Sequence, residues 1–432
     1  MVIAKAAAVL LMGAFLASAG EYEDLFQEAA ALSRQGKFAQ AITKYKAALL
    51  LRPGAPEALN NLAVMYYQTR EYGDAWETAS RIWKNHPEMS SAALIAGLSA
   101  VQLKKPTDAI APFEQALAES PNNRDAILGL AAAHLALNQL PEAAGLYERQ
   151  AARAPGDADG WYGLAICYER MAEGASRKLA KMPGGGFYSK RLLGEFLSAS
   201  GDAQLAREAF GESAGAATDA SPEAAAEYAR ARDLAGKSRD AFQHLVTAAP
   251  DSWQANLFFG DVERQHRNFQ QALAHYEKAA RQKPENSAAL LGIGTVHWEM
   301  GEFDRAEKWL TQALRLNPDA IQATFELANI AVRQHRDDHA IPLLKKYLAQ
   351  QPDAFAARAD LGRAYLHLGQ FALAAEQLGK ATPADTQGDI HYQLAIALRK
   401  LGRDREADEA MKRSAEIRKA ELKREQRLHS GK

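Results

Sequence analysis

The sequence has almost no cysteine, no excess of either charge and, beyond its first twenty residues, no long apolar run. Its single cysteine, Cys167, has no partner for an internal disulfide, so the fold must hold without covalent cross-links. A formal net charge of -1 gives no bulk attraction to nucleic acid or to an anionic membrane, and we expect no nucleic acid as a partner. No later segment has the roughly 20 apolar residues of a membrane-spanning helix, so we expect no integral membrane segment in the processed chain.

The first nineteen residues have the three parts of a secretory signal. Lys5 precedes an apolar run over residues 6–16, and the small residues Ala17, Ser18 and Ala19 follow it. This pattern predicts a cleavable signal peptide over residues 1–19 and a periplasmic or secreted protein. The alternative is an uncleaved N-terminal membrane anchor.

Proline recurs at a fixed interval of 34 residues in two separate series: Pro53, Pro87, Pro121 and Pro155, and then Pro284, Pro318 and Pro352. Between these prolines the apolar and small residues are spaced by three and four, which is typical of helices. A proline ends the second helix of each unit. Glycine, which accepts the left-handed cap conformation, is placed to end the first helix in several units: Gly36, Gly201, Gly301, Gly369 and Gly402. The period indicates a stack of helical hairpins.

The repeating unit resembles the tetratricopeptide repeat. Trp161, Leu164, Ala165 and Tyr168 reproduce the first half of its pattern, and many units have the small and aromatic residues of the second half. The resemblance implies an all-α fold, a right-handed superhelical solenoid of about 12 helical hairpins. It also implies that a protein or peptide partner is held in a concave groove formed by the first helices.

The proline interval breaks once, between Pro155 and Pro284. These residues are 129 positions apart, seven fewer than four repeats require, and Pro183 with the glycines that follow it is expected to cut one second helix short. We therefore predict a signal peptide at 1–19, an N-terminal array at 20–157 and shortened repeats at 158–252 that bend the path. A C-terminal array follows at 253–387, and a last hairpin with a basic capping helix at 388–432.

One segment matches the G-x-S-x-G motif of hydrolases, with Gly211, Ser213 and Gly215. That motif works when a buried strand precedes the serine. Here the preceding residues have a helical pattern, so we predict a structural role for Ser213 and keep a hydrolase as the least favoured alternative. The run of glycines at 184–186 lacks the spacing of a phosphate-binding loop.

Two further features are also interpreted without a catalytic or metal role. His335 and His339 are four residues apart, but they fall at an expected turn between helices without an evident third ligand. Cys167 lies beside core positions and is predicted to be a buried, unreactive thiol, with a redox or intermolecular role as the alternative. We expect no catalytic residue, no cofactor and no metal.

The positions of the expected groove follow from the repeat register of the family. In the N-terminal array they are Asn60, Val64, Tyr67, Leu98 and Tyr162. In the C-terminal array they are Asp261, Arg264, Trp298, Phe325, Asn329 and Arg363. The second set mixes aromatic and charged groups, which favours directional recognition. The alternative for each residue is packing against the next repeat.

These observations favour a non-catalytic scaffold outside the cytoplasm that binds a protein or peptide partner. A periplasmic chaperone or assembly factor for envelope or export machinery is the alternative. The oligomeric state is left open by the sequence.

Overall fold

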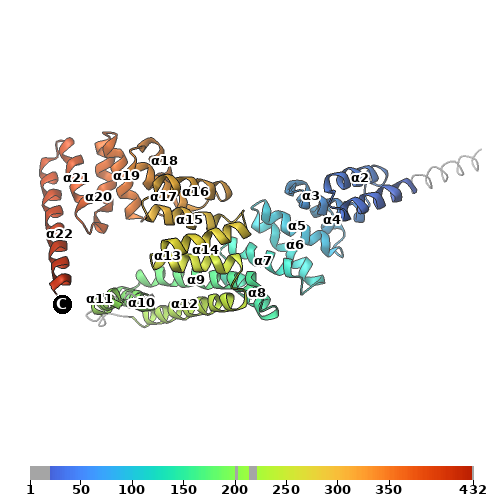
Figure 1. The fold of residues 1–432 in the computed structure, drawn as a ribbon, viewed down its shortest axis with the longest axis horizontal. Helices are drawn as coiled ribbons and strands as arrows, with labels where there is room; N and C mark the ends of the chain where they lie inside the picture. Colours follow the sequence, from blue (N-terminus) through green and yellow to red (C-terminus); the bar gives the residue numbers. More distant parts are fainter. Residues whose placement is uncertain (1–19, 200–202, 214–220, 431–432) are drawn as a thin grey trace, which may run out of the picture. The chain divides into compact units, whose positions relative to one another are not determined.

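The computed structural model describes residues 20–199, 203–213 and 221–430, apart from the side chains of residues 199, 212 and 424–430. In these ranges every regular element is a helix, which confirms the all-α prediction (Figure 1). The chain divides into two compact units, Met1–Pro250 (unit 1) and Asp251–Lys432 (unit 2). No helix within the described ranges is long and apolar enough to cross a membrane. The predicted signal peptide at 1–19 lies outside these residues.

Unit 1 begins with a helix over residues 20–34, and the helices after it pack as successive hairpins. Their bounds are α2 Phe38–Leu51, α3 Pro56–Gln68, α4 Tyr72–Asn85, α5 Ser90–Gln102, α6 Pro106–Glu119, α7 Arg124–Ala136, α8 Leu140–Arg153, α9 Ala158–Ala180, α10 Gly185–Ala199, α11 Ala203–Ser213 and α12 Pro222–Ala248. Each proline of the first series comes two residues after the end of a second helix, as predicted.

Unit 2 continues the same arrangement without interruption until its last helix. Its helices are α13 Trp253–Gln265, α14 Phe269–Gln282, α15 Ser287–Glu299, α16 Phe303–Leu316, α17 Ile321–Arg333, α18 Asp337–Gln350, α19 Phe355–His367, α20 Phe371–Ala381, the short 3₁₀ helix η2 Thr382–Ala384, α21 Asp389–Lys400 and α22 Asp404–Ser430. The last helix is continuous past the repeat, as the absence of glycine and proline in that stretch predicts.

A left-handed residue closes the first helix of most hairpins. This position recurs every 34 residues, at Gly36, Arg70, Lys104 and Asn138 in unit 1 and at Arg267, Gly301, His335 and Gly369 in unit 2. The cap role predicted for Gly36, Gly301, Gly369 and Gly402 is confirmed by their positive φ angles, whereas Gly201 lies outside the described residues. The same left-handed backbone conformation therefore recurs with the 34-residue period, and glycine adopts it in only some of the repeats.

The two helices of a hairpin approach closely where a glycine faces a large side chain sixteen residues later. A Cβ atom on Gly97 would lie 2.7 Å from the ring of Phe113, and one on Gly260 would lie 2.6 Å from the ring of Tyr276. Phe113 and Tyr276 are completely buried. Each glycine thus provides the space that the aromatic core residue fills.

The segment between the two regular arrays differs from the expected shortened hairpins. Helix α9 continues for 23 residues, to Ala180, because no proline interrupts it before Pro183. Its partner is the 27-residue helix α12, and α10 packs on α11 between them in the sequence (Figure 1). Ala175 packs against Leu234, and Leu179 against Tyr228. The long apolar side of α9 is thus covered by α12. The predicted bend in this region stays a prediction.

Candidate functional site

The first helices of the hairpins in unit 2 form a common inner face. Helix α13 contacts α15, α15 contacts α17, α17 contacts α19 and α19 contacts α21. The second helices do not pack on one another to the same extent. Side chains on neighbouring first helices are therefore close enough to interact from one repeat to the next.

Polar side chains link these first helices in a series that we call the polar ladder. Trp298 on α15 donates its indole N–H to Oδ1 of Asn329 on α17, at 3.1 Å, and Asn329 donates Nδ2–H to Oδ2 of Asp360 on α19, at 2.9 Å. Asp360 is also paired with Arg363, whose Nε donates to Oε1 of Gln393 on α21 at 3.3 Å. The ladder thus extends across four consecutive hairpins.

A second set of contacts in the ladder joins α13 and α17 to α15. Arg264 on α13 forms an ion pair with Glu299 on α15, with 2.7 Å between Nη1 and Oε1. The hydroxyl of Thr295 on α15 donates to the carboxylate of Glu326 on α17, at 2.9 and 3.0 Å. Gln322 donates to the same carboxylate at 2.7 Å. Every member of this set is thereby held by a partner in the next repeat or one turn away on its own helix.

Burial shifts the protonation of the two innermost carboxyl groups of the ladder. Glu326 is completely buried, and loss of solvation raises its pKa to about 7. Asp360 is almost as buried, and burial raises its pKa too, although the charge of Arg363 and the amide of Asn329 act in the opposite direction. The hydrogen-bond donors to Glu326 are neutral, so its charge is compensated less directly than that of Asp360.

The structure brings four of the six residues predicted for the C-terminal groove into the ladder: Arg264, Trp298, Asn329 and Arg363. Asp261 accepts a hydrogen bond from the hydroxyl of Tyr276 at 2.6 Å, within its own hairpin. Phe325 packs against Tyr347, with ring centroids 4.9 Å apart. Sequence reasoning missed Thr295, Glu299, Glu326 and Asp360, whose partners are 31 to 35 residues away in the chain. The binding role of all these residues stays a prediction.

The residues predicted for the N-terminal groove are half-buried and make fewer polar links. Asn60 accepts a hydrogen bond from the hydroxyl of Ser91 at 3.0 Å. Val64 and Tyr67 pack beside one apolar cluster, Leu98 lies beside the next, and Tyr162 has an edge-to-face contact with Phe242.

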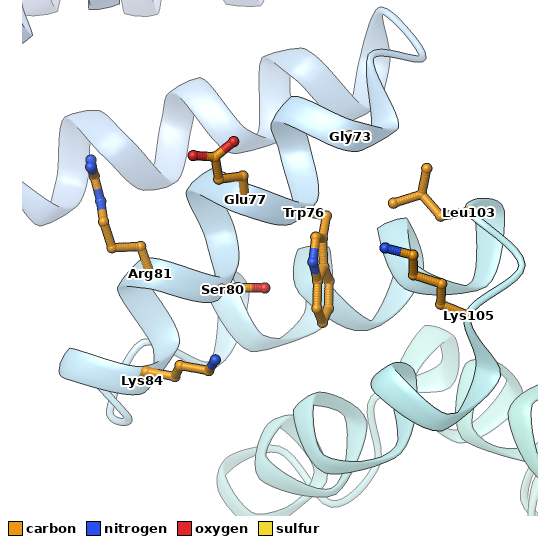
Figure 2. Close-up of a pocket in the computed structure, with 8 residues that line it drawn as sticks. All are labelled: Gly73, Trp76, Glu77, Ser80, Arg81, Lys84, Leu103 and Lys105. Atoms are coloured by element: carbon orange, nitrogen blue, oxygen red, sulfur yellow. The ribbon is translucent and has the colours of Figure 1, made fainter.

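A separate hollow of about 600 Å³ lies beside α4 in unit 1. Figure 2 shows the ring of Trp76 between Ser80 and Lys84 of the same helix and the turn that carries Leu103 and Lys105. Its lining comes from a second helix and a turn, so the hollow is separate from the first helices that carry the predicted binding residues.

Ser213 and Cys167 were considered in the sequence as potentially reactive side chains, and both lie in surroundings typical of a structural role. Ser213 ends α11, so a helix rather than a strand precedes it, and its hydroxyl donates to the carbonyl of Phe210 at 2.6 Å. Gly215, the last residue of that motif, lies outside the described residues. Cys167 is completely buried, as predicted, and burial raises the pKa of its thiol to about 11.

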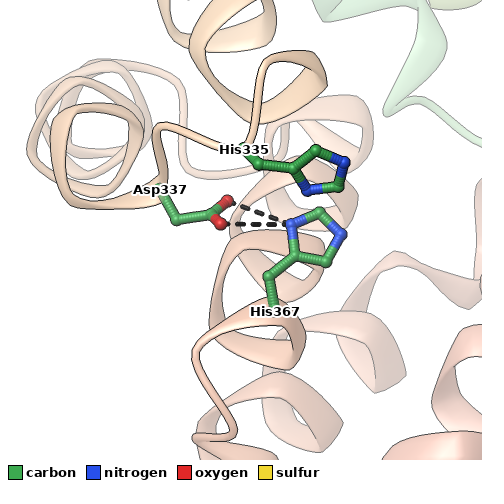
Figure 3. Close-up of side chains that lie close together, drawn as sticks. All are labelled: His335, Asp337 and His367. Atoms are coloured by element: carbon green, nitrogen blue, oxygen red, sulfur yellow. Dashed lines mark hydrogen bonds and ion pairs between the residues drawn. The ribbon is translucent and has the colours of Figure 1, made fainter.

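One cluster of side chains in unit 2 was not anticipated from the sequence. No third ligand was evident there for His335 and His339, but in the structure His367 from the end of α19 lies beside His335 and Asp337 (Figure 3). One potential ligand atom of each residue lies within 4.8 Å of the others. His339 is not part of the cluster. Sequence reasoning missed this cluster because it depends on a contact between repeats, and His367 follows Asp337 by 30 residues.

Comparison with known proteins is consistent with this architecture. Three sequence profiles described as tetratricopeptide repeat match the chain: one at residues 100–167, 263–326 and 331–398, a second at 26–89, 74–124 and 221–287, and a third at 388–421. No curated protein gave a significant match.

Solved structures of repeat proteins are also similar. A MamA fragment from Desulfovibrio magneticus RS-1 is 20% identical, with 39% of this chain and 97% of that chain covered and a TM-score of 0.36. YrrB, described as a TPR protein with an unusual peptide-binding site, is 19% identical over 41% of this chain and 91% of its own, with a TM-score of 0.37. A tetratricopeptide repeat protein from Parabacteroides merdae ATCC 43184 is 13% identical over 72% of this chain and 99% of its own, with a TM-score of 0.49. The recurring hairpins and the profile matches along both units together show that this chain belongs to the tetratricopeptide repeat family.

Proposed function

We propose that this protein is a non-catalytic scaffold that holds an extended protein or peptide partner along the inner face of α13, α15, α17 and α19. Stacked helical repeats bind other proteins on the extended surfaces that their successive helices form. Membership of the tetratricopeptide repeat family supports this general role. The choice of unit 2 as the binding surface depends on the polar ladder.

The observation that carries this choice is the fixed position of the ladder side chains before any partner is bound. Asn329 is held from both sides, by Trp298 and by Asp360, and Arg363 is held by Asp360 and Gln393. Ordering long side chains on binding costs about 0.5–1.5 kcal/mol each, and prior order avoids much of that cost. A surface of this kind favours a defined partner over many unfolded clients.

The exposed parts of the ladder indicate what the partner presents. The side chain of Arg264 is 29% exposed and that of Arg363 is 32% exposed, and Arg333 is exposed beside them. The carboxyl groups of Glu326 and Asp360 are buried and do not face a partner. Guanidinium groups bind carboxylates with two parallel hydrogen bonds. We therefore infer a partner segment with acidic side chains among apolar ones.

The proposed location is outside the cytoplasm. The support is the charged, apolar and small-residue pattern over residues 1–19. Intact-mass measurement of the protein purified from its native cells tests this proposal. A mass that corresponds to a chain beginning at Gly20 supports it, and a mass that includes residues 1–19 contradicts cleavage.

Site-specific photo-crosslinking in native cells tests the binding face. A photoreactive amino acid is placed at Gln322, an exposed member of the ladder on α17, and a matched one at Lys308, an exposed residue of the second helix α16. We expect one defined protein adduct from position 322 and none from position 308. The double variant Arg264→Ala and Arg363→Ala is expected to weaken the adduct at least about tenfold, since two charged contacts are lost.

Three results would contradict the proposal. Equal crosslinking at positions 308 and 322 would show that the first helices are not the binding face. An unchanged adduct in the double variant would remove the ladder arginines from recognition. A broad mixture of adducts at position 322 would instead favour a chaperone with many clients.

A further inference from the structure

The cluster of His335, Asp337 and His367 lies at the junction of two adjacent hairpins in unit 2. His335 is in the turn between α17 and α18, Asp337 is the first residue of α18, and His367 is the last residue of α19. Asp337 is buried, whereas the two histidines are exposed. The cluster therefore has a fixed carboxylate beneath and two imidazoles open to solvent, so an ion can enter from outside.

The distances suit a shared metal ion. Nδ1 of His367 lies 3.1 and 3.2 Å from the two carboxylate oxygens of Asp337. Two ligands of a tetrahedral zinc ion, each about 2.0–2.1 Å from the metal, are about 3.3 Å apart. The observed separation is close to that value without any movement of the backbone.

The third ligand is already positioned beside this pair. Figure 3 shows the ring of His335 over the ring of His367, on the side where Nδ1 faces the carboxylate. The two ring centroids are 4.6 Å apart, and the ligand atoms of all three residues lie within 4.8 Å of one another. His335 is exposed and lies within reach of the other two ligand atoms, so it is the third candidate ligand.

His335 occupies the left-handed position that closes a first helix, which Arg70, Lys104, Asn138 and Arg267 occupy in other repeats. Its φ angle is +55°, and glycine occupies the equivalent position one repeat earlier and one repeat later, at Gly301 and Gly369. A left-handed φ is costly for a residue with a side chain, and glycine avoids that cost. Histidine therefore adds a metal-binding group at a site where the fold itself requires no side chain.

We propose that His335, Asp337 and His367 bind one Zn²⁺ ion that joins the hairpin α17–α18 to helix α19. Two imidazole nitrogens and a carboxylate oxygen form a ligand set that zinc prefers, and water completes the fourth position. Binding requires a neutral imidazole with an unprotonated Nδ1 at His367, so zinc replaces the present hydrogen bond to Asp337. The site uses none of the residues of the polar ladder.

Isothermal titration of the untagged, metal-free full chain with ZnCl₂ tests the proposal. We expect the cluster to bind one zinc ion per chain. We expect no comparable heat of binding with MgCl₂, because Mg²⁺ prefers oxygen ligands. His335→Gly and His367→Ala are each expected to weaken zinc binding at least about tenfold, since even the loss of an outer partner of a ligand costs about 10–100-fold. His339→Ala, at an exposed histidine of α18 outside the cluster, is the matched control and is expected to bind as the wild type does.

Thermal melting separates loss of the site from loss of the fold. The His335→Gly chain is expected to melt as the wild type does in EDTA, because glycine is accepted at positive φ. Zinc is expected to raise the melting midpoint of the wild type and not that of His335→Gly, since binding to the native state stabilises it. Equal zinc affinity in the wild type and both cluster variants would show adventitious binding only and would overturn the proposal. Absence of zinc binding by the wild type at micromolar concentration would overturn it as well.

Discussion

Replacement of Glu326 by glutamine is expected to remove a pH dependence from the stability of unit 2. Glu326 is completely buried on α17, and its carboxylate accepts hydrogen bonds from the neutral groups of Thr295 and Gln322. Burial raises its pKa from 4.5 to about 7. At about 1.4 kcal/mol per pKa unit, that change corresponds to about 3 kcal/mol between the two protonation states.

The sign follows from which state holds the proton. Between pH 4.5 and 7 the native carboxyl group keeps a proton that the unfolded chain has released. The free energy of unfolding is therefore highest below this window and falls as the pH rises through it. Glutamine mimics the protonated form at every pH. The Glu326→Gln variant is therefore expected to gain about 3 kcal/mol relative to the wild type between pH 4.5 and pH 8.

Urea denaturation at a series of pH values, followed by tryptophan fluorescence, measures this difference. Unit 2 contains Trp253, Trp298 and Trp309 as reporters. Glu277→Gln, the same chemical change at an exposed position of α14, is the control and is expected to give a difference from the wild type that does not vary over this range. If the wild-type and Glu326→Gln curves stay parallel from pH 4.5 to pH 8, then the buried carboxyl group is not protonated in the native state and the reasoning fails.

Two further predictions concern the core. Gly292→Ala places a Cβ atom 2.5 Å from the buried ring of Tyr276 and is expected to destabilise unit 2 by about 1–3 kcal/mol in urea denaturation, whereas Gly379→Ala, with open space around it, is expected to be neutral or slightly stabilising. Equal midpoints for the two variants would refute the tight contact. The buried thiol of Cys167, with a pKa raised to about 11, is expected to react with iodoacetamide at pH 8 at least about tenfold more slowly in the native chain than in urea. Rapid labelling of the native chain would contradict this expectation.

The fold could be predicted from the sequence because the same short-range sequence signals recur in each repeat. Proline after each second helix and small residues facing aromatic ones define a hairpin within 34 residues, and these signals need no knowledge of distant contacts. The left-handed position was only partly visible, because Arg70, Lys104 and Asn138 occupy it as well as glycine. The long pair α9 and α12 was missed because a helix that continues past its repeat has no marker of its own until Pro183.

The candidate sites were predictable only in part, because their contacts cross between repeats. Trp298 and Asn329 were found from register, but their hydrogen bond depends on side-chain directions that register does not give. The cluster around Asp337 was missed for the same reason, since His367 belongs to the next hairpin. Spacing of about one repeat between chemically matched residues is the signal that could have found both.

The pairing of α9 with α12 has a consequence for the order in which the chain folds. Ser238 donates a hydrogen bond to the carbonyl of Ala165, 73 residues earlier, whereas the links of the polar ladder from one helix to another join residues 30 to 35 apart. Closing the longer loop costs less than about 1 kcal/mol more, but contacts between distant residues form more slowly. The flanking hairpins can therefore form first. The side of α9 with Ala175 and Leu179 stays uncovered until α12 has been synthesised, so this apolar surface is open to aggregation during that interval.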